Sequence, residues 1–311
     1  MKPKVSRAVE YSKGTDLKFR KKLETFLKQF QKQLINEFIL SMADEQTIPE
    51  TTTMAKDESL TFRPKNPFDE ANLKRIKGKI NKEILRDPEG FRLRLDDFIA
   101  KNMVRWVGVG NTHGRKIADW YVRNLAKDLS LAQKRGFLAA GIRPDVFKKF
   151  WSQDKNIGNF YVSPKVSQNF QNMVNETTGL ITNMATNELA QVRAAFMDVF
   201  SGGGTLSNVT DVLNKMENVS KARAKRITLD QTLKLSNQIK TENCESLGIT
   251  EGIWIHVPGQ YTSRKTHIEM NGKRFKLSEG LYDPAVGRKV KCGELYYCRC
   301  VFRSVIPEEF M

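Results

Sequence analysis

The residues of this sequence with the clearest chemistry are one histidine and three cysteines close to its C-terminal end. His267, Cys292, Cys298 and Cys300 form an H-x24-C-x5-C-x-C array. Thiolates and imidazoles are the ligands that zinc prefers, and four of them complete a tetrahedral shell. Cys298 and Cys300 lie two positions apart, which in a strand turns both side chains to one face. The array predicts a structural zinc site, because a shell filled by side chains leaves no open position to activate water.

Two alternatives to this ligand set remain open. The cysteines can be reduced, partly buried packing residues, with His267 capping the turn at Asn271-Gly272. His256, on an expected strand, could replace Cys292 as the fourth ligand, although a hydrogen-bonded strand histidine is the commoner case. The choice between these readings depends on how the chain folds around the array.

The elements that must position the array are a long helix and a small sheet. A predicted N-cap at 218–220 precedes a segment with apolar residues at helical spacing, and Gly248 ends that helix as a C-cap. Three short β-type runs follow at 253–257, 274–277 and 300–305. Such a sheet is too small to be stable by itself, so it must pack on the helix or hold a metal.

The N-terminal two-thirds is predicted to be mainly helical, which makes the fold class α+β. Helix breaks are expected at 87–90, 108–111, 141–144 and near 178–179, and the glycines at 202–204 make another. The predicted organisation is a basic amphipathic N-terminal helix in residues 1–40, a linker or arm at 41–67, a helical domain at 68–166, a C-terminal domain at 167–306 and a tail at 307–311. The segment GVGNTHG lacks the context of a phosphate-binding loop, and its His113 is interpreted as a surface residue.

The N-terminal helix has two interpretations. Its apolar residues recur at intervals of three and four, as in an ordinary bundle helix. If this stripe is not internal core, the helix could dock in the groove of a partner protein. The candidate partner-binding residues are Phe19, Phe26, Phe30 and Phe38. The few basic residues before the helix are expected to be mobile.

Composition limits the partners. Lys and Arg number 52 against 35 Asp and Glu, a formal charge of +17 that attracts polyanions such as DNA. No apolar run reaches the ~18 to 20 residues of a membrane span, and no apolar signal core follows the basic start. We therefore expect a protein made in a cytoplasm that does not enter membranes. The clustered cysteines then favour a metal over disulfides.

Three blocks near the C-terminus resemble a known protein family. Residues 223–237 contain RAKRITLDQT followed by LSN, residues 267–275 read HIEMNGKRF, and Gly293-Glu294 leads to Cys298-Arg299-Cys300. In their order and spacing over residues 221–306, these blocks resemble the Mu F-like head morphogenesis family of phages. Two departures concern the metal array: Cys292 stands where proline is common, and the histidine often found shortly before C-R-C is absent.

The resemblance implies a minor head protein that works in capsid assembly through contacts, not catalysis. It implies association with the portal protein and with scaffold or major capsid protein, in procapsids and virions assembled in the host cytoplasm. It also implies contact with double-stranded DNA in some members. Candidate DNA-binding residues, which fit the basic charge, are Arg223, Lys225, Arg226, Arg264, Lys265, Lys273, Arg274, Arg288, Lys289 and Lys291. A non-specific DNA-binding protein and a zinc-supported nuclease or injected effector are the alternatives.

Overall fold

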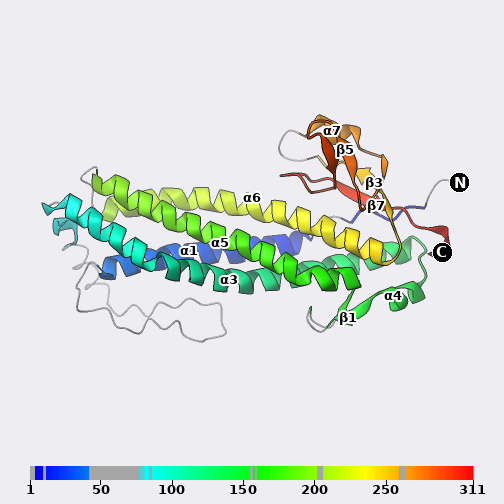
Figure 1. The fold of residues 1–311 in the computed structure, drawn as a ribbon, viewed down its shortest axis with the longest axis horizontal. Helices are drawn as coiled ribbons and strands as arrows, with labels where there is room; N and C mark the ends of the chain where they lie inside the picture. The colour runs from blue at the N-terminus through cyan, green and yellow to red at the C-terminus, as the bar shows by residue number, and fades with distance from the viewer. Residues whose placement is uncertain are drawn as a thin grey trace. The chain divides into compact units, whose positions relative to one another are not determined.

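The fold consists of long helices followed by small antiparallel sheets, which confirms the α+β class (Figure 1). The computed structural model describes residues 4–9, 12–41, 78, 80–83, 86–154, 157, 160–201, 206–258 and 263–310. Its helices are α1 (Lys13–Ser41), α3 (Pro88–Ala139), α4 (Pro144–Phe150), α5 (Pro164–Ser201), α6 (Leu206–Ser246) and α7 (Lys265–Glu269), with a 3-10 turn at Glu308–Phe310. Its strands are β1 (Ser152–Asp154), β2 (Phe160–Val162), β3 (Glu251–Ile255), β4 (Arg274–Lys276), β5 (Leu281–Asp283), β6 (Arg288–Val290) and β7 (Val301–Ser304). None of the helices described is long and apolar enough to cross a membrane.

The chain forms two compact units, each assembled from separate stretches of sequence. The first unit contains Met1–Arg20, Arg115–Thr178 and Lys225–Met311, and the second contains Lys21–Gly114 and Gly179–Ala224. The units therefore do not coincide with the consecutive segments predicted from the sequence. Residues 42–67, most of the predicted linker, lie outside the described residues.

The second unit has an aromatic core. Phe30 is fully buried and meets Trp106 of α3 edge-on, with ring centroids 5.1 Å apart. Phe26 is also buried and stacks on His113, with centroids 6.0 Å apart. The docking role predicted for Phe26 and Phe30 is corrected, because rings that fill the core cannot also insert into a partner. The side chain of Phe38 lies outside the described residues.

The helix break predicted at 108–111 is wrong, because α3 runs through it. A Cβ atom built on Gly110 would lie 3.0 Å from the Cβ of Ala185 on α5. This glycine therefore allows two helices to approach closely, where the sequence suggested a turn. His113 consequently lies on a helix and not in a surface loop, and its side chain is half-buried.

In the first unit, the helices meet around a buried polar chain. Phe19 stacks on Tyr121 with ring centroids 3.9 Å apart, so its predicted docking role is corrected as well. The Tyr121 hydroxyl donates to Thr232 Oγ1 at 2.8 Å, and Thr232 lies 2.9 Å from a carboxylate oxygen of Asp16. Burial raises the pKa of both Tyr121 and Asp16. These contacts connect α1, α3 and α6 within this unit.

Two helices are longer than the sequence predicts. α5 passes through Thr178-Gly179 without interruption, and the Thr178 hydroxyl donates to the carbonyl of Val174 at 2.7 Å. α6 begins at Leu206, so residues 218–220 are not its N-cap. Its predicted end is confirmed: Gly248 has φ +77, and the Ile249 amide donates to the Cys244 carbonyl. A left-handed glycine is the usual way to close a helix.

The predicted sheet is confirmed as three antiparallel strands in the order β4-β3-β7. Trp254 of β3 pairs with Phe302 of β7, and both belong to a core that also contains Phe147 and Trp151. In Figure 1 the sheet lies beside the yellow C-terminal end of α6, whose Cys244 joins the same core. Residues that precede the sheet in the sequence, such as Phe147 and Trp151, therefore form part of the hydrophobic core on which it packs.

Val5 and Ser6, which belong to the N-terminal stretch expected to be mobile, extend this sheet. Val5 forms an antiparallel bridge with Val305. The Ser6 amide donates to the Ser304 carbonyl at 3.0 Å, and Ser6 Oγ accepts from the Ser304 amide at 3.1 Å. The buried Lys240 ammonium donates to the Val9 carbonyl at 2.8 Å. For the described residues 4–9 the expectation of mobility was wrong, because backbone pairing next to β7 is a long-range contact that local composition does not reveal.

Candidate metal centre

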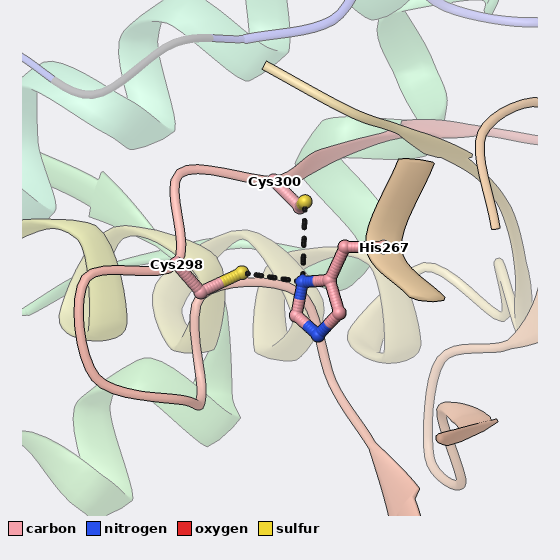
Figure 2. A group of neighbouring side chains, drawn as sticks. All are labelled: His267, Cys298 and Cys300. Carbon is pink, nitrogen blue, oxygen red and sulfur yellow. Dashed lines mark hydrogen bonds between the residues drawn. The ribbon is translucent and has the colours of Figure 1, made fainter. Parts of the chain in front are cut away.

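His267 and two of the cysteines converge on one buried point. Cys298 Sγ lies 3.3 Å and Cys300 Sγ lies 3.6 Å from His267 Nδ1 (Figure 2). All three donor atoms lie within 4.8 Å of one another, and all three side chains are buried. α7 carries the histidine, and the segment just before β7 carries the cysteines. Cys298 and Cys300 precede the strand, but they are buried on either side of the less buried Arg299, as the predicted alternation requires.

A carboxylate contacts the second ring nitrogen of His267. Its Nε2 lies 3.2 Å from Oδ2 of Asp283, which is fully buried at the end of β5. The second Asp283 oxygen accepts from the Ala285 amide at 2.9 Å. A carboxylate on the remote nitrogen fixes the ring and its tautomer, as it does for histidines that bind zinc. His267 therefore does not cap the turn at Asn271-Gly272.

Sequence reasoning missed Asp283. Its only local signal is Asp283-Pro284 between two short β-type runs, which is typical of a turn. That the carboxylate turns inward to His267 depends on how the β5–β6 hairpin packs against α7. A position preceding proline in a turn does not indicate a buried acid.

The loop that carries the cysteines is anchored on α6. The Tyr297 amide donates to Asp230 Oδ1 at 2.6 Å, and Tyr297 has a φ of 58. Asn237 Nδ2 donates to the Cys300 carbonyl at 3.2 Å. Gly293 has φ +74, and a Cβ there would lie 3.0 Å from the Leu233 carbonyl oxygen and closer still to Asn237. The loop is thus held on the helix by hydrogen bonds from its backbone to Asp230 and Asn237, and Gly293 leaves no room for a side chain at this contact.

The electrostatics favour a thiolate at Cys298. The hydrogen bond from Cys300 and the contacts with His267 lower the pKa of the Cys298 thiol to about 4, despite burial. The Cys298 neighbour and burial raise the pKa of Cys300. Burial by itself would lower the pKa of His267, but Cys298 and Asp283 raise it. The thiolate is the form of cysteine that binds metals.

The donor distances fit a tetrahedral zinc ion. With Zn–S bonds of about 2.3 Å and Zn–N bonds of about 2.0 Å, a tetrahedral angle places nitrogen and sulfur ligands about 3.5 Å apart. The observed separations from His267 Nδ1 are 3.3 Å to Cys298 and 3.6 Å to Cys300. The group formed by His267, Cys298 and Cys300 could hold a metal ion.

Cys292, the fourth predicted ligand, is not part of this group. It is buried, and its thiol donates to the Val301 carbonyl at 3.3 Å. His256 contacts one member of the group, with Nδ1 3.6 Å from Cys300 Sγ. The backbone amide of His256 donates to Asn271 Oδ1 at 2.9 Å. The structure thus brings together three of the four predicted ligands and adds a different neighbour.

The C-terminal sequence blocks that suggested a phage family meet at this site. The helix block supplies Asp230 and Asn237, the second block supplies His267, and the last supplies Gly293 and the two cysteines. A comparison with family models found that the model described as Phage Mu protein F like protein matches residues 190–303. The C-terminal region is Phage Mu F-like.

Comparisons of the whole chain with curated proteins and with solved structures found no match. The family match is thus confined to the Phage Mu F-like region, residues 190–303, which includes every residue of the metal group.

The predicted DNA-binding residues of this region differ in their surroundings. Lys225, Arg226, Arg264, Lys265, Lys273 and Lys291 are exposed, and Arg223 is half-buried. Arg274 pairs with Glu251, Arg288 with Glu294 and Lys289 with Glu279. Lys265, Lys273 and Lys291 form no ion pair with a described carboxylate. Lys265, Lys273 and Lys291 are therefore more available than the paired cations to contact a phosphate.

Proposed function

We propose that this protein acts in phage capsid assembly through contacts and not through catalysis. The observation that carries this proposal is the Phage Mu F-like match over residues 190–303, whose sequence blocks converge on one buried site. A minor head protein of this kind would be a component of procapsids and virions. It would contact the portal protein and scaffold or major capsid protein.

A structural role for the site is supported by how its groups are used. Both ring nitrogens of His267 are engaged, one by the thiols and the other by Asp283. The ring, Cys298 and Cys300 are buried, so none of them stands free to act as a base toward an external substrate. The nuclease alternative has no comparable support in this arrangement.

Within this function, the site would hold one structural zinc ion. A small sheet with short strands has little stability of its own. The metal ligands come together only in the folded chain, so the free energy of metal binding adds to the free energy of folding. The purified full-length protein should contain about one equivalent of zinc, as expected for a single shell of thiolate and imidazole ligands. Well-folded protein that contains no metal would contradict this part of the proposal.

The assembly role is tested by locating the protein in particles. Mass spectrometry of purified procapsids and virions, combined with cross-linking, should find a few copies joined to the portal protein. Absence from both particles, or normal head formation without the protein, would exclude the assembly role. Scaffold or shell cross-links in place of portal cross-links would identify a different position in the head.

Contact with DNA is the second part of the proposed role, supported by the exposed cations of the Phage Mu F-like region. Affinity for arbitrary duplex DNA should fall steeply as salt rises, because each phosphate that a cation neutralises adds about 0.9 to the slope of log affinity against log salt. Combined Lys265→Ala, Lys273→Ala and Lys291→Ala changes should reduce this slope. The matched control, Arg274→Ala, Arg288→Ala and Lys289→Ala, should reduce it less because these cations are paired. No binding even at low salt would remove DNA contact.

A further inference from the structure

We propose that His256 is the fourth ligand of the metal site, so that the shell consists of His256, His267, Cys298 and Cys300, and that Cys292 is not a ligand. This inference rests on the proposed zinc site and identifies how that site is completed. It changes the predicted donor set from three sulfurs and one nitrogen to two of each.

The first argument is distance. His256 Nδ1 lies 3.6 Å from Cys300 Sγ, the same separation as that between His267 Nδ1 and Cys300 Sγ. Both values are close to the nitrogen-to-sulfur edge of about 3.5 Å in a tetrahedral zinc shell. Cys300 therefore already has two imidazoles at ligand spacing, one on each of two chain segments. A sulfur shared in this way is expected at the corner of a metal site.

The second argument is how His256 is held. It directly follows β3, and its amide donates to Asn271 Oδ1 in the turn after α7, the helix of His267. The backbone of His256 is therefore tied to the element that carries the first imidazole. His256 is not within 4.8 Å of all three other donors, so its ring must turn toward Cys298 when a metal binds. The ring is only half-buried, so this rotation does not displace the core.

The third argument concerns Cys292, which is engaged elsewhere. Its side chain is buried, and its thiol donates to the Val301 carbonyl at 3.3 Å. Ligation would remove that proton and leave the buried carbonyl without this donor. The contact that ligation would replace at His256 is its hydrogen bond with Cys300, which is itself a ligand of the proposed shell. Metal binding by Cys292 would thus break a hydrogen bond to the backbone, whereas metal binding by His256 would not.

The proposed shell would join three separate segments of the first unit. His256 lies after β3, His267 lies on α7, and the two cysteines lie just before β7. β3 and β7 are hydrogen-bonded neighbours, whereas α7 lies in the connection from β3 to β4. One ion would therefore join the two strands, at the end of the pair where Ile255 lies opposite Val301, to the connection between β3 and β4.

X-ray absorption on the full-length, zinc-loaded wild-type protein tests the donor set directly. The expected shell is two sulfurs at about 2.3 Å and two nitrogens at about 2.0 Å. Three sulfurs and one nitrogen would overturn the assignment of His256 while leaving the zinc site intact. Protein that takes up no zinc would overturn both the site and its fourth ligand.

Variants provide a second readout, zinc affinity measured by competition with a chromophoric chelator. His256→Ala should weaken affinity by more than the 10–100-fold that is typical for loss of an outer-shell partner. His256→Cys should restore tight binding, with a third sulfur in the absorption spectrum. The control is Cys292→Ser, which keeps a donor for the Val301 carbonyl and should retain wild-type affinity. Unchanged affinity in His256→Ala together with loss in Cys292→Ser would reverse the assignment.

Discussion

The aromatic core of the second unit and the C-terminal module, residues 251–306 of the first unit, are stabilised in different ways. The former packs large side chains such as Phe30, Phe91 and Trp106 from long helices. The module has strands of only three to five residues and, beside an apolar core that includes Trp254 and Phe302, it buries polar groups such as His267 and Asp283. Apolar burial is spread over many contacts, whereas a polar network depends on each member being satisfied.

This difference predicts how the stability of each region responds to amino-acid substitution. Loss of one ring from a helical core removes apolar contacts but leaves the backbone hydrogen bonds of each helix intact. Loss of one anchor in the module leaves a buried donor or acceptor without a partner. The module should therefore be the more sensitive to small polar changes, and the helical core to large apolar ones.

The largest effect is expected from removal of the two thiolates. Cys298→Ser combined with Cys300→Ser should abolish zinc binding, and amide exchange across residues 251–304 should accelerate. Structural zinc contributes directly to folding. Exchange in the helices of the second unit should be unchanged, which hydrogen-exchange mass spectrometry would resolve.

The matched control for the thiolates is Cys244→Ser. Cys244 is also buried, but its thiol lies 3.1 Å from Ser304 Oγ and outside the metal group. This variant should keep about one equivalent of zinc, as expected for an intact shell. Equal protection of the module in metal-free and metal-loaded protein would mean that the ion is not needed for the fold.

The next largest effect is expected in the second unit. Phe30→Ala should lower the free energy of unfolding by about 3–5 kcal/mol, as is typical for a buried aromatic ring. Leu93→Ala is the control, because Leu93 is 60% exposed. Its effect should stay within about 0.5 kcal/mol. Urea unfolding followed by circular dichroism measures both, and similar values would show that Phe30 is not a core residue.

A smaller effect is expected where the cysteine loop meets α6. Gly293→Ala should destabilise the protein by about 2–3 kcal/mol, because a left-handed backbone is strained for alanine and the methyl would collide with the helix. Gly287→Ala has the same φ of +74 but meets nothing within 4 Å. It should cost only about 1 kcal/mol. Equal costs for the two glycines would refute close packing of this loop.

The smallest effect is expected at the Tyr297 anchor. Asp230→Ala leaves the Tyr297 amide without its acceptor, at a cost of about 1–2 kcal/mol. Asp230→Asn retains an oxygen acceptor and avoids a carboxyl whose pKa burial raises, so its cost should be less. Unfolding free energies of the two variants, with exchange rates of the Tyr297 amide, separate these cases. A larger loss with asparagine than with alanine would contradict the anchoring role.

The sequence by itself determined some of the elements. Helical periodicity predicted helices but divided α3 and α5, which are continuous. Short β-type runs predicted β3, β4 and β7, and Gly248 predicted the closure of α6. These features depend on residues close together in the chain. The three members of the metal group were also predicted, because histidine and closely spaced cysteines are recognisable as metal ligands from residue type and spacing alone.

Only the tertiary structure decided which side chains face one another. It placed Phe19, Phe26 and Phe30 in the core, and it paired the N-terminal residues with β7. It also brought Asp283 to His267 and placed the Cys292 thiol against the Val301 carbonyl. Each of these results depends on contacts between distant segments, and neither local propensity nor spacing encodes such contacts. The glycine at 110 illustrates the same limit, since its close approach to Ala185 exists only when α3 and α5 have packed.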